Sequence, residues 1–328
     1  MQSPCAHCVY TGASQIVGVS CARIGKPARD SVVITTASNI SVAKICDDGG
    51  TAICTHSWAV SPGHSNRLTT PAVYGAADDR FFVVRNDDTL LSWGCGDSTL
   101  SRSLTEVRLP ASVYRGGSSP NSFVPQARKN IVGVFGHPGL RAFAGTSAVL
   151  VATAGGALLL YCGGCSRSAS LRLCAERDTC MNVERASTCN GGRPTDFSIE
   201  HVRLVALPSI ATFRDGSLTT ERGKQNGRGP GNVLAMVFVR KVESSPNSLG
   251  RTILHELRVY RLQPDAAHVE RRIDLCAVHL LRRITANGNL AVVLSASCHQ
   301  ETRVLSVLWS KQVGSWYLWI SAIVHCSD

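Results

Sequence analysis

The sequence predicts an all-β protein with the architecture of a WD40-like β-propeller. Three observations support this fold: a composition that favours strands, a recurrent pair of apolar runs joined by a short turn, and the order of elements between residues 57 and 94. Val, Thr, Ser and Gly are plentiful, whereas blocks rich in Glu, Lys, Ala and Leu are nearly absent. With 328 residues, 44% of them apolar and 17% charged, the chain is able to bury a large core.

The segment 57–94 has the order in which one blade of a propeller passes to the next. Apolar runs at 57–60 and 68–74 are separated by polar loops from a further run at 81–84. A tight polar turn then leads into a run at 89–93 that ends on an aromatic residue. Strand, loop, strand, turn and strand in this sequence are typical of propeller blades.

The same unit recurs along the chain, and each copy predicts the second and third strands of one blade. Alternation of apolar and polar residues in many of the second runs fits a strand with one buried face. The pairs are 32–36 with 40–45, 81–84 with 89–93, 148–152 with 157–161, 233–239 with 253–260, and 290–294 with 303–309. Flanking runs at 15–20, 131–135, 201–207 and 315–324 supply first and fourth strands.

Residues 1–328 are therefore predicted to form one propeller domain with five visible blades. Polar, Gly-rich stretches near 115–129, 174–194 and 215–231 predict exposed loop inserts. The five blades fit a closed ring, part of a seven-bladed ring in a longer protein, or an incomplete ring that another molecule finishes. An open ring would leave blade edges that need to be covered.

An uncharged segment at 142–165 is long enough to cross a bilayer, but its interior favours a different structure. Gly155 and Gly156 separate two short apolar runs, which predicts a β-hairpin and no membrane partner. No signal peptide opens the sequence. The 14 cysteines have no regular spacing and are interpreted as reduced and mostly buried.

The motifs of enzymes and metal sites are missing or incomplete. Cys5 with Cys8, and Cys162 with Cys165, each have the spacing of half a zinc site, but the two halves lie far apart in the sequence. No nucleophile elbow or phosphate-binding Gly-rich loop occurs. We therefore predict no catalytic residue, metal, cofactor or small-molecule substrate. Three carboxylate pairs are interpreted as turn residues: Asp47-Asp48, Asp78-Asp79 and Asp87-Asp88.

The chain carries 34 Lys and Arg against 23 Asp and Glu, a formal charge of +11. An excess of this size favours polyanionic partners, and Lys and Arg neutralise phosphates without reading base sequence. The alternative is a solvated blade edge. Aromatic residues make up only 6% and are expected to pack between blades, so stacking on bases is not predicted. The candidate RNA-phosphate contacts are Arg222, Lys224, Arg228, Arg282 and Arg283, with Arg258, Arg261, Arg271 and Arg272 as further basic patches.

Residues 57–150 resemble the N-terminal propeller of the nucleolar protein 11 family in the order and spacing of their pieces. The resemblance covers under a third of the chain, and its motifs are structural. The pieces are Ser57-Trp58-Ala59-Val60, 68–73, Phe82-Val83-Val84, Leu90-Leu91-Ser92-Trp93, Ser112-Val113-Tyr114-Arg115, 131–135 and Gly139-Leu140-Arg141.

The resemblance implies a non-enzymatic nucleolar protein of the small-subunit processome that supports pre-rRNA transcription and processing. Its implied partners are other propeller proteins of the early processome subcomplex, together with pre-rRNA. Members of that family continue into a helical C-terminal region, which this sequence lacks. Two other classes stay open: a propeller adaptor outside the nucleolus, and a propeller enzyme with a site in its central channel.

Overall fold

A computed structural model describes residues 15–24, 29–45, 52–60, 66–96, 104–110, 131–142, 145–163, 171–179, 196–206, 211–214, 217–220, 233–244, 251–285, 290–299, 304–313 and 316–325. Within these residues the regular structure is almost entirely β-strand, with one helical turn, η5 (Val269–Arg271). The all-β prediction is therefore confirmed.

Four of the sheets have four antiparallel strands each, and a further sheet has three. The first sheet contains β1 (Ile16–Ile24), β2 (Arg29–Thr36), β3 (Asn39–Ile45) and β4 (Ala52–Ala59). The second contains β5 (Val73–Gly75), β6 (Arg80–Val84), β7 (Thr89–Gly94) and β8 (Thr105–Arg108). The third contains β9 (Ile131–Arg141), β10 (Ser147–Thr153), β11 (Ala157–Cys162) and β12 (Arg172–Asp178).

The fourth sheet has the longest strands and carries a small inserted hairpin between its first two strands. Its order is β13 (Asp196–Ala206), β16 (Val233–Ser244), β17 (Arg251–Leu262) and β18 (Ile273–Thr285). The inserted hairpin is β14 (Ala211–Arg214) with β15 (Ser217–Thr220). The fifth sheet contains β19 (Leu290–His299), β20 (Val304–Val313) and β21 (Trp316–His325).

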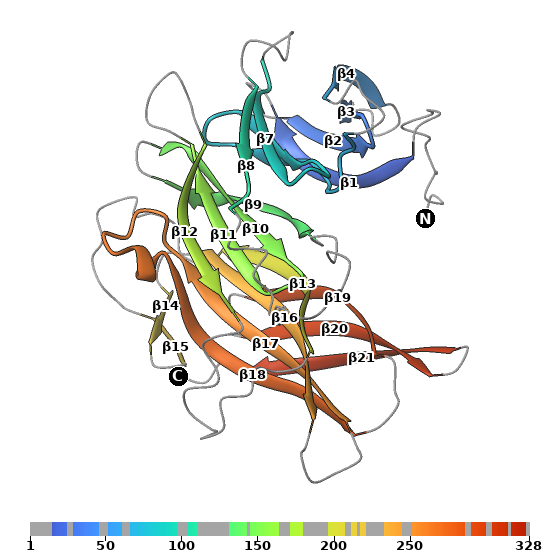
Figure 1. Cartoon of the computed structure of the whole chain (residues 1–328), viewed down its shortest axis with the longest axis vertical. Helices are drawn as coiled ribbons and strands as arrows, with labels where there is room; N and C mark the ends of the chain where they lie inside the picture. Colours follow the sequence, from blue (N-terminus) through green and yellow to red (C-terminus); the bar gives the residue numbers. More distant parts are fainter. Residues whose placement is uncertain are drawn as a thin grey trace, which may run out of the picture.

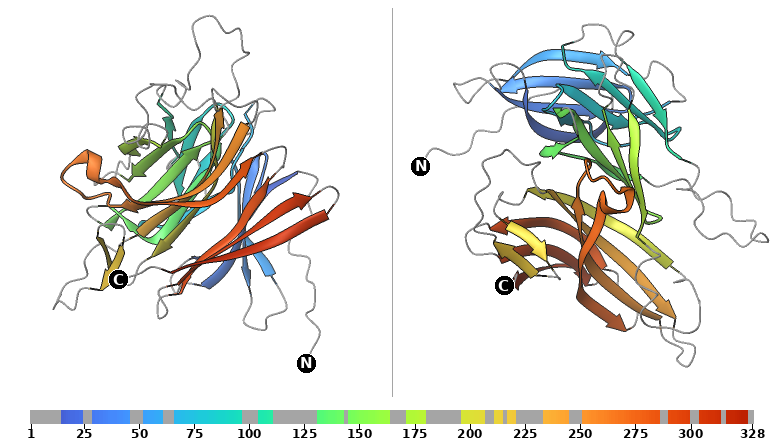
Figure 2. Two further views of the ribbon diagram at one scale, coloured as in Figure 1. Left: turned by 90° about the horizontal axis from the view of Figure 1, so that it is seen from below. Right: turned by 90° about the vertical axis from the view of Figure 1, so that its left-hand side faces the viewer.

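The five sheets stack radially, as the blades of a β-propeller do. The first strands β1, β5, β9, β13 and β19 lie beside one another in that order. Figures 1 and 2 show the blades following an arc in chain order, with the first (blue) and fifth (red) at its two ends. The described strands of these two end blades belong to separate sheets and do not pair with each other.

Glycine allows the first strands of two blades to approach their neighbouring blades closely. A Cβ atom on Gly75 of β5 would lie 2.4 Å from Oγ of Ser147 in the third blade. A Cβ atom on Gly136 of β9 would lie 2.4 Å from Cγ1 of Val73 in the second blade. Both distances are far shorter than van der Waals contact, so any larger residue at these positions would have to displace a side chain of the neighbouring blade.

Separate apolar clusters fill the spaces between the first four blades. Trp58, Phe81 and Trp93 lie in the cluster between the first and second blades. Tyr161 belongs to the cluster between the second and third blades, and Tyr260 to the cluster between the third and fourth. The prediction that Trp58 and Trp93 pack between blades is confirmed, whereas the side chains of Trp309, Trp316 and Trp319 lie outside the described residues.

Four of the five predicted strand pairs occupy the second and third positions of their blades, as expected. The predicted hairpin around Gly155 and Gly156 also forms, between β10 and β11. Gly156 has a φ of 102°, a conformation that explains why glycine stands there. The pairs Asp78-Asp79 and Asp87-Asp88 lie in turns, where Asp79 and Asp88 have positive φ, while Asp47 and Asp48 lie outside the described residues.

Several boundaries differ from the prediction. The fifth pair forms the first and second strands of its sheet, because β19 lies beside β13 at the inner position. The strand predicted at 68–74 is reduced to β5, since Pro71 has no N–H and Thr70 accepts a side-chain hydrogen bond from the Val84 amide.

The predicted inserts also begin in regular structure. Residues 174–178 belong to β12, an edge strand whose charged residues are tolerated because they face solvent. Residues 217–220 form β15, inside the insert predicted at 215–231. The insert predicted at 115–129 lies outside the described residues.

Candidate functional site

The residues predicted to contact RNA phosphates fall in two places. Arg222, Lys224 and Arg228 lie outside the described residues. Arg282 and Arg283 occupy successive positions near the end of β18, opposite His255 and Leu254 of β17 respectively. This places the two arginines on the last strand of the fourth blade, at the outer side of the arc.

Arg258 is not a surface residue, so its assignment to a basic patch is wrong. Its side chain is 1% exposed and donates hydrogen bonds from Nε (3.0 Å) and Nη2 (2.6 Å) to Oε2 of Glu256. Nη1 donates to the carbonyl oxygen of Thr179, and the guanidinium lies 5.2 Å from the ring centroid of Phe197. The alternation of β17 places Arg258 on a buried face, where it joins the fourth blade to the third.

Arg272 is likewise committed to structure, through two backbone carbonyl groups. Its Nε donates to the carbonyl oxygen of Ala266 and its Nη1 to that of Cys174, each at 2.9 Å. The first contact fixes the connection after β17, and the second reaches the outer strand of the third blade. Arg271, in contrast, is exposed on η5.

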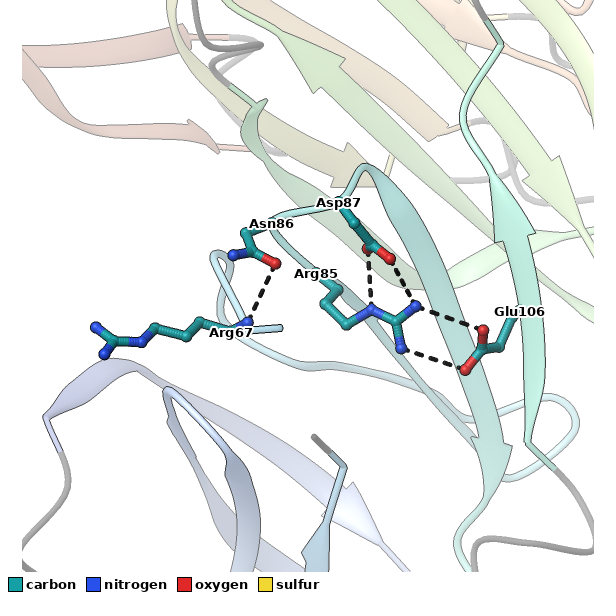
Figure 3. Close-up of polar contacts among 5 residues, drawn as sticks. All are labelled: Arg67, Arg85, Asn86, Asp87 and Glu106. Atoms are coloured by element: carbon teal, nitrogen blue, oxygen red, sulfur yellow. Dashed lines mark hydrogen bonds and ion pairs between the residues drawn. The ribbon is translucent and has the colours of Figure 1, made fainter. Parts of the chain in front are cut away.

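A polar cluster braces the turn between β6 and β7, as Figure 3 shows. Arg85 donates from Nε to Oδ1 of Asp87 at 2.9 Å and from Nη2 to Oδ2 at 2.7 Å, and its Nη1 reaches Glu106 of β8 at 3.3 Å. The hydrogen bond from Arg85 holds the pKa of Asp87 below its usual value. Arg67 is tied to this turn only through its backbone and Asn86, and its exposed side chain extends away from the cluster.

Two histidines from the inner strands of the third and fourth blades share an arginine neighbour. His137 of β9 accepts a hydrogen bond at Nδ1 from the Gly139 amide at 3.0 Å. His201 of β13 lies with its ring centroid 6.0 Å from that of Phe238. Burial lowers the pKa of both histidines, and the charge of Arg203 lowers it further. Sequence reasoning missed this group, because the two histidines are 64 positions apart (201 minus 137) and fit no motif.

The first blade presents apolar residues on the side that faces away from the second blade. Ser20 of β1 points toward the second blade, since its Oγ donates to the carbonyl oxygen of Ala72 at 2.8 Å. Val19 and Cys21 alternate with Ser20 and therefore point the other way. Val19 is 56% exposed, and Cys21 is also exposed. The end of the arc thus offers an uncovered apolar position.

Two cysteines meet on the outer strands of the third blade. Cys162 of β11 and Cys174 of β12 lie close enough that each shifts the pKa of the other, and the Cys174 thiol donates to the carbonyl oxygen of Arg172 at 3.6 Å. Cys165, which has the spacing of half a zinc site with Cys162, lies outside the described residues. No cluster of three or more His, Cys, Asp or Glu suited to a metal ion occurs in the part of the chain that the structure describes.

No protein-family model matches the chain, and no curated protein matches it. Solved structures with a similar fold include the Nup133 β-propeller domain of Vanderwaltozyma polyspora, with 9% identity, a TM-score of 0.45, and 91% of this chain and 73% of that chain covered. A protein from Lactobacillus plantarum has 11% identity and a TM-score of 0.40, with 87% of this chain and 64% of that one covered. A functionally unknown protein from Desulfotomaculum acetoxidans has 9% identity and a TM-score of 0.39, with 97% and 92% covered.

These likenesses concern the fold alone, and the assignment of a β-propeller rests on this chain's own radial sheets. They do not bear on the nucleolar protein 11 family. Among the described residues, no helix is both long enough and apolar enough to span a bilayer.

Proposed function

We propose that this chain is a non-catalytic propeller scaffold that supports small-subunit processome assembly, and with it pre-rRNA transcription and processing in the nucleolus. The scaffold role is supported by one observation above all: the arc of blades ends on a first blade whose outward face exposes Val19. The outward face of the first blade has no neighbouring blade among the described strands, and we propose that this is the face on which another protein packs. The nucleolar and processome assignment rests on the resemblance of residues 57–150.

The proposed partners are other propeller proteins of the early processome subcomplex. A blade of such a partner would pack against the first sheet in the way that the second blade packs against its other side. The aromatic contacts of Trp58 with Phe81 and Trp93 illustrate how tightly two blades join in this fold. No cofactor or small-molecule substrate enters this proposal.

Contact with pre-rRNA is proposed to occur through backbone phosphates. The formal charge of +11 supports it, and Arg282 with Arg283 are the described residues that the proposal assigns to it. Replacing both arginines by Gln would reduce the slope of log Kobs against log salt by about 1.4 if each contacts a phosphate of single-stranded RNA. An unchanged slope would assign the RNA contacts to other residues or to partner proteins.

The processome proposal is tested by recovery of the tagged full chain from nucleolar extract. We expect particles that contain U3 RNA and processome proteins in the bound fraction. Val19→Lys places a charge on the exposed face and is expected to reduce that recovery about tenfold while the protein stays folded. Val269→Lys is the matched control, because Val269 is 53% exposed on η5, away from the first blade.

A propeller adaptor outside the nucleolus is the competing function, and the exposed first blade suits it equally well. Localisation of the full chain in cells separates the two. Concentration in nucleoli supports processome assembly, whereas a diffuse or cytoplasmic distribution together with absence of U3 RNA from the bound fraction would refute it.

A further inference from the structure

The register of β11 and β12 brings two thiols together at the edge of the third blade. Cys162 pairs with Arg172 and Leu160 pairs with Ala175, while a register shift between Leu160 and Tyr161 accommodates the extra residue on β12. Cys174 is that extra residue. A bulge of this kind redirects a side chain, and here it brings Cys174 to the apolar cluster that contains Cys162 on the neighbouring strand.

The two thiols have different surroundings. Cys162 is buried in the apolar cluster between the third and fourth blades, whereas Cys174 is half-buried and packs at the border of that cluster. The neighbouring Cys162 thiol lowers the pKa of Cys174, and the positive charges of Arg272 and Arg172 lower it further. Cys174 and burial raise the pKa of Cys162.

We propose that Cys162 and Cys174 are a peroxide-sensitive thiol pair that closes into a disulfide across the β11–β12 edge. Cys174 is the attacking group, because it is the accessible member and stands beside the guanidinium of Arg272. Cys162 is the resolving group, because it is shielded from solvent and lies next to Cys174 on the neighbouring strand, in the same apolar cluster. Neither the zinc-like spacing of Cys162 with Cys165 nor the scaffold function accounts for this arrangement.

The oxidant in this reaction is hydrogen peroxide, and the steps balance as follows. The Cys174 thiolate attacks one peroxide oxygen, the O–O bond breaks, and the hydroxide that leaves takes up a proton to give water. The Cys162 thiol then attacks the sulfur of the Cys174 sulfenic acid, an S–S bond forms, and a second water leaves with the Cys162 proton. Two thiols and one peroxide thus give one disulfide and two waters.

Closure of the disulfide would act on the contact between the third and fourth blades. The carbonyl oxygen of Cys174 accepts the hydrogen bond from Nη1 of Arg272, which also holds the chain after β17 through Ala266. Fixing Cys174 to Cys162 ties β12 to β11 and holds this carbonyl in place. Oxidation is therefore expected to raise the midpoint temperature of thermal unfolding, and reduction to restore it.

The test treats the reduced full chain with one equivalent of hydrogen peroxide, blocks the remaining thiols, and maps tryptic peptides by mass spectrometry. We expect residues 173–177 linked to residues 142–167, with a mass about 2 Da below the sum of the two free peptides. The exposed Cys21 and Cys54 are internal controls: they should stay reduced at this dose and be recovered in the alkylated form. Residues 142–167 contain both Cys162 and Cys165. Fragmentation of the linked peptide shows which of the two is bonded to Cys174, without the need for a variant.

Two variants separate the roles of the cysteines. Cys162→Ala is expected to abolish the cross-link and leave Cys174 as a sulfenic acid that dimedone traps, whereas Cys165→Ala keeps the cross-link. A link through Cys165 would overturn the proposal, and so would oxidation of Cys21 and Cys54 while Cys174 stays unlinked. This outcome is independent of nucleolar recovery, so the thiol pair and the proposed function can fail separately.

Discussion

The contact between the first and second blades differs in chemistry from the contact between the third and fourth. In the first, Trp58, Phe81 and Trp93 pack with ring centroids 5.3 to 6.0 Å apart. In the second, a mostly aliphatic cluster that also includes Tyr260 and Phe197 accompanies the buried ion pair of Arg258 with Glu256. The buried cluster of the first contact contains no charged side chain, whereas the second contact contains a buried pair of opposite charges.

This difference shows that one fold joins its blades in two ways with opposite sensitivities. An aromatic contact loses stability in proportion to the area and volume removed. A buried ion pair contributes little when compared with apolar residues of the same size, yet losing one partner leaves an uncompensated charge. The contact between the first and second blades and the contact between the third and fourth should therefore tolerate different kinds of substitution.

Trp93→Ala is expected to produce the largest effect. Trp93 is fully buried and stacks on Phe81 at 5.6 Å, so its truncation should lower the free energy of unfolding by about 4 kcal/mol. Urea unfolding followed by circular dichroism measures this. Trp93→Phe is the control and should cost only about 1 kcal/mol, because it keeps a ring and removes an indole N–H that has no hydrogen-bond partner within the described residues. Equal losses in the two variants would mean that ring packing does not hold the blades together.

Glu256→Ala tests the other side of the comparison. It leaves the 1% exposed guanidinium of Arg258 without its carboxylate and should lower the free energy of unfolding by about 3 kcal/mol. The double variant Glu256→Gln with Arg258→Met should return to within about 1 kcal/mol of the wild type, since both charges are gone. A double variant that is as unstable as the single one would contradict the view that the lone charge is the cause.

Gly156→Ala tests the hydrogen bonds that connect the β10–β11 turn to this ion pair. The carbonyl oxygen of Gly156 accepts from both the amide and the hydroxyl of Thr179, whose own carbonyl accepts from Arg258. Because the φ of Gly156 is 102°, alanine should cost about 2 kcal/mol in unfolding free energy. Gly155→Ala is the matched control next to it, with open space around a Cβ, and should be close to neutral in thermal unfolding.

Arg85→Gln is expected to have the smallest effect, because its partners are partly exposed. Asp87 and Glu106 side chains are 36% and 46% exposed, so solvent screening limits the loss to about 1 kcal/mol at neutral pH. The pKa of Asp87 is lower in the folded protein, so its contribution is complete above the unfolded pKa and disappears as the pH falls through the folded one. Stability curves of wild type and variant should therefore converge below about pH 4, and a constant difference down to pH 2 would show that the ion pair is not responsible.

The sequence predicted the strand pairs of the blades well because each pair has a local signature in the sequence. Apolar runs on both sides of a turn, such as those around Gly155 and Gly156, carry both the strands and their pairing. The edge strand β12 was missed because an outer strand needs few apolar residues. Its charged residues Arg172, Glu176 and Arg177 are typical of an exposed loop. The inner strand β5 was predicted too long, because the predicted strand at 68–74 ran through Pro71, which has no N–H to donate to a neighbouring strand.

The candidate site was harder to predict, because its residues come together only through the fold. Cys174 lies next to Cys162 through a bulge that no spacing rule anticipates. Arg258 looked like a surface charge in a basic stretch, yet the alternation of a long central strand buries it beside Glu256. His137 and His201 share Arg203 only because the inner strands of two blades are neighbours.

The 13-residue strand β18 has a consequence for how the protein behaves at high concentration. As the last strand of its sheet it leaves one row of backbone N–H and C=O groups without a strand partner among the described residues, and such a row is a template on which a foreign strand can grow. Val278 and Leu280, 42% and 57% exposed, would favour fibril formation at this row, while the formal charge of +11 opposes it because copies of the chain repel one another. Salt weakens that repulsion, so concentrated solutions should stay clear at low ionic strength and scatter light as salt is added.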